Sequence, residues 1–438
     1  MKKAAIHTLG CKVNQYESEA IASMMQEAGY EMVPFDDYAD CYIINTCTVT
    51  SLSDRKSRQM IRRAKKHNPN AIVVATGCYA QTAPEDVSRI DGVNVIVGTS
   101  RRAEIPKLIE QAADRPVWAV RDIMQEREFE SLHVPAYQER TRAFLKIQDG
   151  CDRYCSYCII PYARGRVRSR PLADIVSEVE ELCGKGYCEF VLSGIHVASY
   201  GKDLENIGLL DAIACVNRIK GVKRVRLGSV EPGCMTKEFV TALASMEKFC
   251  PHFHISLQSG SARTLKRMNR HYTPEEYLAS VEAVRDSFKN PAISTDVMVG
   301  FCGETEEEFE ESYQFVKQVG FSQIHVFPYS VRKGTRAAGF PDHVSPERKE
   351  ERASRMLALG ESLSRTFLES QQGETAQVLA ERQIGDGLYE GFTKNYARVH
   401  FAVGEEKGKS DKNGLVGQIV TVKLKRAEKD FIFGQLEM

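Results

Sequence analysis

Three cysteines occupy one short stretch near the middle of the chain. The run Cys151-Asp-Arg-Tyr-Cys155-Ser-Tyr-Cys158 has C-x3-C-x2-C spacing and follows Gly150 at the end of a predicted strand. A compact loop can fold three such thiolates around one iron–sulfur cluster, which leaves one iron of a four-iron cluster open to an external molecule. The alternative is a structural zinc site or three unconnected thiols. Zinc sites pair two C-x2-C knuckles, however, and no second pair follows at suitable spacing.

A second trio of cysteines is spread over the first part of the chain. Cys11, Cys47 and Cys78 each follow the end of a predicted strand. Because the carboxyl ends of parallel strands share one edge of a sheet, loops after neighbouring strands can converge there. We therefore expect this trio to hold a second cluster with a free iron. The alternative is three buried cysteines that only fill space.

The composition limits the class of protein. A chain of 438 residues, with 42% hydrophobic and 27% charged residues, is expected to form two or three globular domains. Because the formal net charge is zero, contact with RNA must come from local basic patches. No apolar run is long enough to cross a bilayer, so we expect no membrane association and a cytoplasmic location. Thirteen cysteines in a reducing compartment favour metal or catalytic use over disulfides.

The first part of the chain, residues 1–120, alternates short strands with amphipathic helices, which predicts a parallel α/β sheet. The predicted strands are Ala4–Thr8, Asp40–Asn45, Ala71–Thr76, Val93–Val97 and Pro116–Val120, and the predicted helices are Tyr16–Ala28, Leu52–His67 and Arg101–Ala113. Residues 121–140 are polar and charged and are predicted to form a linker.

The middle and last parts of the chain have different patterns. Residues 141–370 predict six βα units and hence a partial (β/α) barrel, whose site belongs at the carboxyl ends of its strands. These strands are Ala143–Gln148, Glu189–Ser193, Val222–Gly228, Phe253–Gln258, Ile293–Val299 and Gln323–Tyr329. Residues 371–438 predict a small antiparallel β-barrel of short strands separated by Gly-containing turns. Its strands are Thr375–Gln383, Gly387–Thr393, Ala397–Phe401, Gln418–Lys425 and Phe431–Gln435.

A cysteine run of this kind on a partial barrel resembles the radical S-adenosylmethionine (SAM) superfamily. Further stretches make the resemblance specific to the methylthiotransferases, and they occur in the right order along nearly the whole chain. These stretches are Thr8–Glu19, Asn45–Thr50, Arg226–Pro232, His254–Gly260 and Thr295–Phe301.

This resemblance implies three domains: an N-terminal cluster-binding domain, a radical SAM core and a C-terminal TRAM domain that binds RNA. It also implies two [4Fe–4S] clusters and two uses of SAM. One SAM methylates a sulfur held at the N-terminal cluster and another supplies a radical. The clusters then carry the chemistry, without a side chain as catalytic acid or base. An aromatic C–H bond is neither acidic nor nucleophilic, so a radical must open it while a sulfur donor is held nearby.

The sequence around the first cysteine indicates the substrate. Gly10-Cys11-Lys12-Val13-Asn14-Gln15-Tyr16-Glu17 resembles most closely the branch that methylthiolates N6-threonylcarbamoyladenosine at C2 of adenine 37 in tRNA. The branch that acts on N6-isopentenyladenosine usually has Gly-Cys-Gln-Met-Asn here and is the main alternative. A third branch acts on an aspartate of a ribosomal protein. A remote alternative is a non-catalytic zinc- and RNA-binding module.

Seven residues are candidates for binding SAM. Tyr157 stands where the family has an aromatic residue beside the adenine, and the others lie at or near the ends of barrel strands or, for Asp296, within one. Each has a structural alternative: packing for Tyr157, a core position for Asp296, and hydrogen bonds to loop backbone for several of the rest. The candidates are Tyr157, Ser193, Gly194, His196, Glu231, Gln258 and Asp296.

Basic and aromatic residues are candidates for RNA contacts. Arginines after the cysteine run can bind phosphates, and aromatic residues of the C-terminal barrel can stack on bases unless they pack in its core. The basic helix Leu52–His67 is either a further RNA contact or a solvated face. The candidates are Arg164, Arg166, Arg168, Phe392, Lys394, Tyr396 and Arg398. Expected partners are the tRNA anticodon stem-loop and an electron donor such as flavodoxin or ferredoxin.

Overall fold

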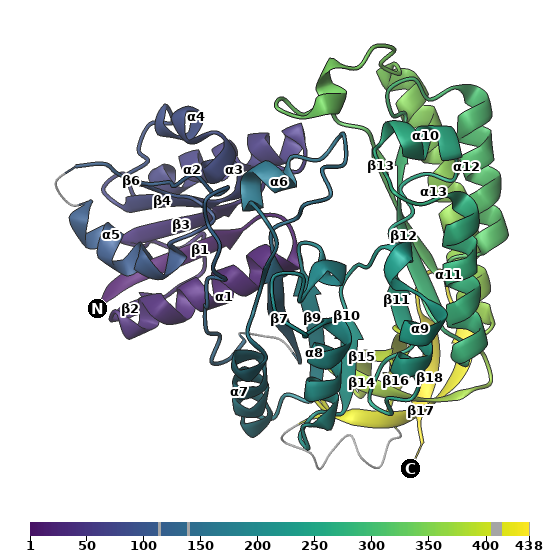
Figure 1. Ribbon diagram of the computed structural model, residues 1–438. Coiled ribbons are helices and arrows are strands. Elements are labelled where there is room, and N and C mark those ends of the chain that lie inside the picture. The colour runs from purple at the N-terminus through teal and green to yellow at the C-terminus, as the bar shows by residue number, and fades with distance from the viewer. Residues whose placement is uncertain (113–114, 138–140, 404–413, 438) are drawn as a thin grey trace.

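The computed structural model describes residues 1–112, 115–137, 141–403 and 414–437. It confirms the predicted fold class: a parallel α/β sheet, then a partial barrel, then a small closed barrel. In Figure 1 the purple and blue N-terminal sheet lies beside the teal and green barrel, with the yellow C-terminal strands at the lower end of that barrel. None of the helices in these described ranges is both long and apolar enough to span a membrane.

The N-terminal sheet is parallel throughout, with strand order β2-β1-β3-β4-β5-β6. Its central strands β1, β3 and β4 are neighbours, and buried apolar side chains cover both faces of the sheet. The three-residue strand β2 and the short helices α3 and α4 were not predicted, because such short elements carry little periodic pattern. The elements are β1 (Lys2–Thr8), α1 (Lys12–Glu27), β2 (Tyr30–Met32), β3 (Cys41–Thr46), α2 (Ser51–His67), β4 (Ile72–Gly77), α3 (Cys78–Thr82), α4 (Pro84–Ser88), β5 (Val95–Val97), α5 (Ile105–Gln111) and β6 (Val117–Ala119).

The barrel consists of two sheets, ordered β10-β9-β7-β8 and β11-β12-β13. Isolated bridges from Val225 to Phe249 and from Val230 to Ile255 connect the first sheet to the second. The strands are β7 (Arg142–Asp149), β8 (Arg168–Ser169), β9 (Glu189–Gly194), β10 (Arg224–Leu227), β11 (His252–His254), β12 (Ala292–Val299) and β13 (Gln323–Pro328). The helices of eight or more residues are α7 (Leu172–Gly184), α8 (Leu209–Arg218), α9 (Lys237–Ala244), α11 (Pro274–Ser287), α12 (Glu306–Val319) and α13 (Pro346–Glu369), and the shorter ones are α6 (Ile160–Arg164) and α10 (Ala262–Arg267).

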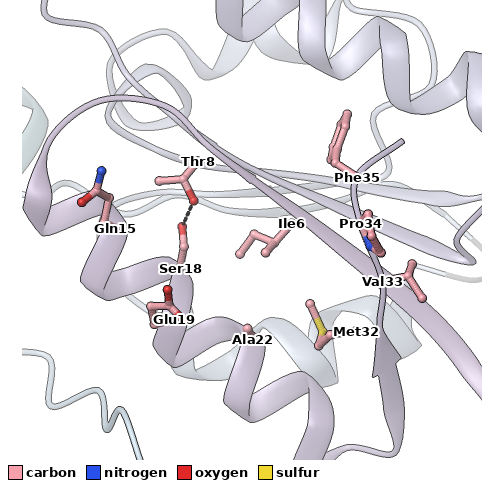
Figure 2. A pocket seen from close by; sticks show the side chains of 10 residues that line it. All are labelled: Ile6, Thr8, Gln15, Ser18, Glu19, Ala22, Met32, Val33, Pro34 and Phe35. Carbon is pink, nitrogen blue, oxygen red and sulfur yellow. Dashed lines mark hydrogen bonds between the residues drawn. The ribbon is translucent and has the colours of Figure 1, made fainter. Parts of the chain in front are cut away.

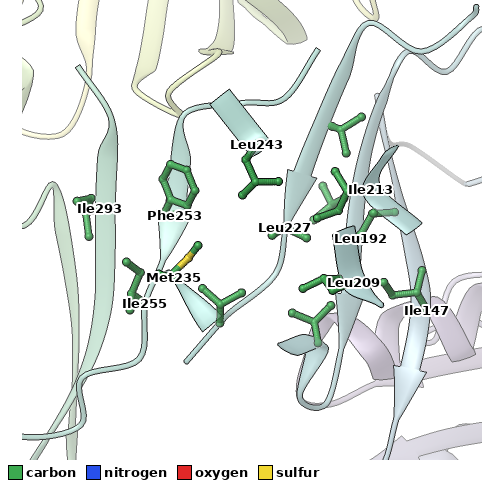
Figure 3. Close-up of a cluster of buried hydrophobic side chains, with 14 of the residues drawn as sticks. Ile147, Leu192, Leu209, Ile213, Leu227, Met235, Leu243, Phe253, Ile255 and Ile293 are labelled. Carbon is green, nitrogen blue, oxygen red and sulfur yellow. The ribbon is translucent and has the colours of Figure 1, made fainter. Parts of the chain in front are cut away.

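Side chains alternate between the two faces of each barrel strand. Apolar residues such as Ile147, Leu192 and Phe253 belong to one core shared with the surrounding helices (Figure 3). Between them in the strands stand polar residues such as Arg142, Arg226 and His254. Successive residues of a strand point to opposite faces, so these polar side chains face the interior of the barrel.

The C-terminal domain is a closed barrel of five strands, β14-β15-β16-β18-β17. Its pairs are antiparallel except for β16 with β18, which run parallel; the sequence had predicted an entirely antiparallel barrel. The long helix α13, which follows the sixth predicted strand but whose bounds were not predicted, leads into this barrel. The strands are β14 (Thr375–Gly385), β15 (Leu388–Thr393), β16 (Arg398–Ala402), β17 (Ile419–Ala427) and β18 (Ile432–Leu436).

The N-terminal domain contacts the barrel from two directions. Helix α1 packs against β7 and β9. Helix α2 and the loop before it contact the segment after β13, where Arg332 bonds Asp54 at 2.7 Å and Thr48 at 2.6 Å. The N-terminal domain therefore contacts the barrel at β7 and β9 through α1 and beyond β13 through α2 and the loop before it.

Candidate functional site: two cysteine trios

The structure brings Cys11, Cys47 and Cys78 to one edge of the N-terminal sheet. They follow the adjacent strands β1, β3 and β4, whose ends are in register. Burial raises the pKa of each thiol. A neighbouring thiolate raises it further, with Cys47 acting on Cys11, Cys78 on Cys47, and Cys11 on Cys78. The three sulfurs thus lie close enough together to influence one another, as the strand pattern predicted.

Two glycines allow this approach. Gly10 has a φ of +106°, and a Cβ there would lie 3.0 Å from the sulfur of Cys47. Gly77 has a φ of +93°, and a Cβ there would lie 2.5 Å from the carbonyl oxygen of Thr46. Other residues would be strained in this left-handed region and would push the loops apart.

Two asparagines connect the loop that carries Cys11 to the loop that carries Cys47. The Asn14 amide donates to the carbonyl oxygens of Leu9 at 2.7 Å and Thr46 at 3.0 Å. The Asn45 amide donates to the carbonyl oxygen of Asn14 at 2.9 Å. Sequence reasoning assigned these asparagines no role, although both lie within three residues of a cysteine.

The second trio lies in a single loop directly after β7. Gly150, with a φ of +74°, lets the loop turn where a Cβ would lie 1.7 Å from the carbonyl oxygen of Arg166. The backbone N–H of Ser156 donates to the carbonyl oxygen of Met268 at 2.9 Å, which fixes the loop against the end of α10. Burial, together with the neighbouring thiolates, raises the pKa of Cys151 to about 11 and of Cys158 to about 12.

Both trios have donor sets suited to iron–sulfur clusters. Each supplies three sulfurs, and at each a guanidinium nitrogen lies 3.2 Å from one sulfur, Arg164 Nε at Cys78 and Arg270 Nη1 at Cys155. Such N–H groups stabilise thiolate-bound clusters, whose ligands must be deprotonated. In the part of the chain that is described, no three His, Cys, Asp or Glu side chains are arranged to hold a single metal ion. A four-iron cluster is several atoms wide, so its ligands stand further apart.

Arg164 connects the two trios. It ends α6, the helix after the second cysteine loop, and its fully buried guanidinium donates to Cys78, to Asn14 Oδ1 at 2.5 Å and to Glu17 at 3.0 Å. It also lies 3.3 Å from Asp149, two residues before Cys151. Helices α3 and α6 lie side by side in Figure 1, so the two cysteine sites share a boundary.

The expectation that Arg164 and Arg168 bind RNA phosphates is corrected by this burial. Arg168 is 3% exposed and donates to the carbonyl oxygen of Arg164 at 2.9 Å. Both side chains are occupied by internal partners and do not reach the surface. Arg166, between them, is exposed. The buried carboxylates of Glu17 and Asp149 explain the difference, because buried charges require partners.

Two of the SAM candidates meet beside the second trio. Glu231 forms ion pairs with His196 at 3.0 Å, Arg153 at 2.7 Å and Arg270 at 3.0 Å, and Arg270 also contacts Cys155. Although burial alone would raise the pKa of Glu231, the hydrogen bond from His196 and these positive charges lower it to about 2. Sequence reasoning missed Arg153 and Arg270, because nothing in their spacing indicates that they converge on Glu231.

The other SAM candidates are more dispersed. The Ser193 hydroxyl donates to the carbonyl oxygen of Leu145 at 3.1 Å, and Gly194 ends β9 beside it. Tyr157 packs at the edge of Phe301, with ring centroids 6.3 Å apart. A third group lies on the barrel's second sheet: Asp296 pairs with His254 at 3.2 Å, and Gln258, with a φ of +65°, forms a bridge to Val297.

Positive side chains gather in the barrel interior below these residues. Lys12, next to Cys11, places its ammonium group 5.6 Å from the centre of the Phe144 ring. Desolvation by the surrounding protein lowers the pKa of Lys12, although the residue keeps solvent-accessible surface, and the charges of Arg142 and Arg226 lower the pKa further. Burial likewise lowers the pKa of His252, with further lowering by Arg226 and Lys12.

Residues of the C-terminal barrel close the lower end of this interior. Tyr396 stacks on His252 with centroids 4.5 Å apart and on Phe392 with centroids 4.7 Å apart. The guanidinium groups of Arg142 and Arg226 lie 4.9 and 4.8 Å from the Tyr396 ring.

These contacts correct the expectation that Phe392, Lys394 and Tyr396 form a free RNA-binding face. Both rings pack against the core domain, and Lys394 donates to the carbonyl oxygen of Glu247. Arg398 is partly exposed and pairs with the exposed Asp430 at 3.3 Å, so it stays a candidate for RNA contact.

Two open cavities lie near the first trio. One, of about 1120 Å³, lies between the N-terminal domain and the barrel and is lined by Thr48, Tyr79 and Ile159, each of which directly follows a cysteine of one of the trios. The other, of about 820 Å³, lies in the N-terminal domain between α1 and the segment after β2 (Figure 2). Its wall includes Thr8 and Ser18, joined by a 2.7 Å hydrogen bond. Neither lining includes a cysteine, but of the two cavities the first is the one lined by residues that adjoin cysteines of both trios in the sequence.

Comparisons with known proteins agree with this geometry. Residues 3–98 match the model of the Uncharacterized protein family UPF0004, and residues 145–316 match that of the Radical SAM superfamily. A solved structure of a radical SAM methyltransferase, TsrM from Kitasatospora setae, has a TM-score of 0.54 at 17% identity over 75% of both chains, which shows a shared fold. Fold and site together define a radical SAM protein with an additional cysteine-bearing N-terminal domain.

Relatives of known name cover almost the whole chain. A threonylcarbamoyladenosine tRNA methylthiotransferase of Bacillus subtilis is 42% identical over 99% of this chain and 96% of its own length. One of Thermotoga maritima is 35% identical over 93% of each chain. A tRNA-2-methylthio-N6-dimethylallyladenosine synthase of Clostridium botulinum is 34% identical over 98% of this chain and 96% of its own. The chain belongs to the radical SAM methylthiotransferase family.

Proposed function

We propose that this protein methylthiolates C2 of N6-threonylcarbamoyladenosine at position 37 of tRNA. The observation that carries the proposal is the shared boundary of the two cysteine trios, connected by Arg164 beside one cavity. A reaction that opens a C–H bond and inserts sulfur needs a radical source and a sulfur donor within reach of the same base. The relatives from B. subtilis and T. maritima, which carry this substrate in their names, support the choice of base.

The residues of the two sites take separate roles in this proposal. Cys151, Cys155 and Cys158 would hold a cluster that would bind SAM at its open iron and supply the electron for radical formation. Cys11, Cys47 and Cys78 would hold a second cluster that would carry the sulfur. Arg270 and Arg164 each direct an N–H group at one of the ligand sulfurs.

We also propose a SAM-binding role for the seven candidates near the barrel mouth. Glu231, held by His196, Arg153 and Arg270 beside Cys155, is the best supported of them. The others keep the roles expected from the sequence, with Ser193, Gly194 and Tyr157 near the second trio and Gln258 and Asp296 on the opposite sheet.

The anticodon stem-loop is the proposed RNA partner, which places the activity in the cytoplasm. Helix α2 lines the cavity between the domains with Ser51, Asp54 and Arg58, and the same helix carries the exposed cations Arg55, Lys56 and Arg62. With Arg166 and Arg398 they can neutralise phosphates around the base. An external electron donor such as flavodoxin or ferredoxin completes the proposal.

The test is an anaerobic assay of the cluster-reconstituted protein with SAM, a reductant and defined anticodon stem-loops. Stem-loops carrying threonylcarbamoyladenosine should yield the 2-methylthio nucleoside, detected by mass spectrometry after digestion. The matched stem-loop carrying isopentenyladenosine tests the alternative raised by the C. botulinum relative. Product from only the isopentenyl substrate would overturn the assignment of the base, and a protein that binds zinc but no iron would overturn the chemistry.

A further inference from the structure

The barrel interior beside Cys11 holds positive charges that its own carboxylates only partly neutralise. Glu189 is shared by Arg142 at 3.8 Å, Arg224 at 3.2 Å and Arg226 at 2.6 Å. Glu381 of the C-terminal barrel pairs with Arg142 at 2.7 Å, and Asp296 is 3.2 Å from His254. Within the described ranges, no carboxylate lies within ion-pair distance of Lys12.

Lys12 has a position that suits contact with the reacting base. It directly follows the ligand Cys11, it is exposed, and its ammonium group lies over Phe144, which is buried on β7. Arg142, two residues before Phe144, is on the same face of β7. Arg142 and Arg226 are close enough for their charges to act on the Lys12 ammonium group. A ligand that enters this interior therefore meets a concentrated positive field.

The two substrates considered for this family differ most in charge. The threonylcarbamoyl group ends in a carboxylate, whereas the isopentenyl group is an uncharged hydrocarbon. An ammonium group covered by a hydrocarbon loses its water without gaining a partner, which is costly. A carboxylate in the same place replaces that water with a charge-assisted hydrogen bond and is attracted by the neighbouring arginines.

We propose that Lys12 is a specificity-determining residue whose ammonium group binds the carboxylate of the threonylcarbamoyl group. Arg142 and Arg226 supply additional positive field without leaving their own ion pairs. Because Lys12 adjoins Cys11, this contact holds the modified base beside the first cysteine trio. The inference rests on the proposed function and assigns it a residue that distinguishes the two substrates.

The test removes the charge from the protein and from the substrate in turn. The variants are Lys12→Gln and Lys12→Arg, and the substrates are stem-loops with threonylcarbamoyladenosine or with its carboxylate converted to a primary amide. For the wild-type enzyme kcat/KM should favour the carboxylate by about 10- to 100-fold, the range expected for one hydrogen bond between charged groups. Lys12→Gln should lose most of this preference and Lys12→Arg should keep most of it.

A second measurement is independent of turnover. The Kd values of the same two stem-loops are measured by fluorescence anisotropy without SAM. The wild-type protein should bind the carboxylate form more tightly than the amide form, and Lys12→Gln should lose most of this difference. Lys107→Gln, which removes an exposed lysine of α5, is the matched control and should leave the preference in kcat/KM and the difference in Kd unchanged. Iron and sulfide content and SAM cleavage without RNA verify that the Lys12 variants retain both clusters.

The possible results separate the inference from the proposed function. If the wild-type enzyme modifies no threonylcarbamoyl substrate, the proposed function fails. If it modifies the carboxylate form preferentially and Lys12→Gln preserves that preference, Lys12 does not recognise the carboxylate. Equal weakening of both substrates by Lys12→Gln would assign the lysine to an RNA phosphate and would also overturn the inference.

Discussion

The two cysteine trios each bring three sulfurs together, but by opposite routes. Cys151, Cys155 and Cys158 lie in one loop that a single glycine and a few backbone hydrogen bonds hold in place. Cys11, Cys47 and Cys78 come from three loops, and they meet only because β1, β3 and β4 are neighbours in register. The first arrangement is local in sequence, whereas the second depends on the tertiary structure of a whole sheet.

The two sites also differ in where their arginines originate. Arg270, which contacts Cys155, belongs to the same domain as the loop it supports. Arg164, which contacts Cys78, belongs to the barrel and crosses the domain boundary to reach the N-terminal site. The N-terminal site is therefore incomplete without the barrel, whereas the barrel site lies entirely within its own domain.

The largest expected effects come from removing one ligand at each site. Cys158→Ala should abolish both SAM cleavage and methylthiolation, because the proposed barrel cluster would initiate the reaction. Cys47→Ala should abolish methylthiolation while SAM cleavage continues, measured as release of 5′-deoxyadenosine. Each variant should lose about half of the bound iron. Methylthiolation by Cys47→Ala would show that the N-terminal trio is not the source of the sulfur.

A smaller effect is expected from Gly77→Ala, which tests how strongly the N-terminal trio depends on its sheet. A Cβ at this position would collide with the Thr46 carbonyl and would require a residue other than glycine at positive φ. Unfolding free energy should fall by about 1–3 kcal/mol or more, as for a strained backbone position, and the N-terminal cluster should be lost in iron analysis.

Gly29→Ala is the control for that prediction. Gly29 has a φ of +85°, yet nothing lies within 4 Å of its Cβ position, so the substitution adds strain without a collision. It should destabilise the protein by about 1 kcal/mol and leave both clusters in place. Equal iron loss in the two variants would mean that the close approach at Gly77 does not support the site.

The smallest effect is a change of reduction potential in Arg164→Lys and Arg270→Lys. Lysine keeps the charge but removes the guanidinium N–H directed at sulfur, and fewer hydrogen bonds to sulfur disfavour the reduced cluster. The potential of the N-terminal cluster should fall in Arg164→Lys, and that of the barrel cluster in Arg270→Lys. Redox titrations followed by electron paramagnetic resonance measure both. If either variant changed the reduction potentials of both clusters equally, each arginine would not act on one cluster alone.

Much of this organisation could be predicted from the sequence because it follows local rules. Alternation of strands and helices predicted both α/β parts, and the run from Cys151 to Cys158 needs no tertiary knowledge. The meeting of Cys11, Cys47 and Cys78 was predicted from a general property of parallel sheets, that their strand ends share one edge. The short strands β8 and β2 escaped prediction, whereas β5 and β6, which have three residues each, lie within predicted strands.

The errors concern side chains whose surroundings come from distant elements. Arg164 and Arg168 follow the cysteine run like exposed phosphate-binding residues, but Glu17 of another domain and Asp149 bury them in ion pairs. Phe392 and Tyr396 were expected to be open to RNA, but they meet Arg142 across a domain boundary. Whether a charged or aromatic residue is exposed depends on docking of domains, which local pattern does not encode.

The attachment of the C-terminal barrel has a consequence for how this protein can diverge. Arg224 donates to the carbonyl oxygens of Gln377 and Phe392, and Arg226 donates to those of Thr393 and Lys394. These acceptors are main-chain atoms, which every amino acid provides. Residues on the outer surface of the small barrel can therefore be substituted to bind a different RNA without loss of these four hydrogen bonds. A C-terminal barrel exchanged between distant homologues should make the same bonds to Arg224 and Arg226.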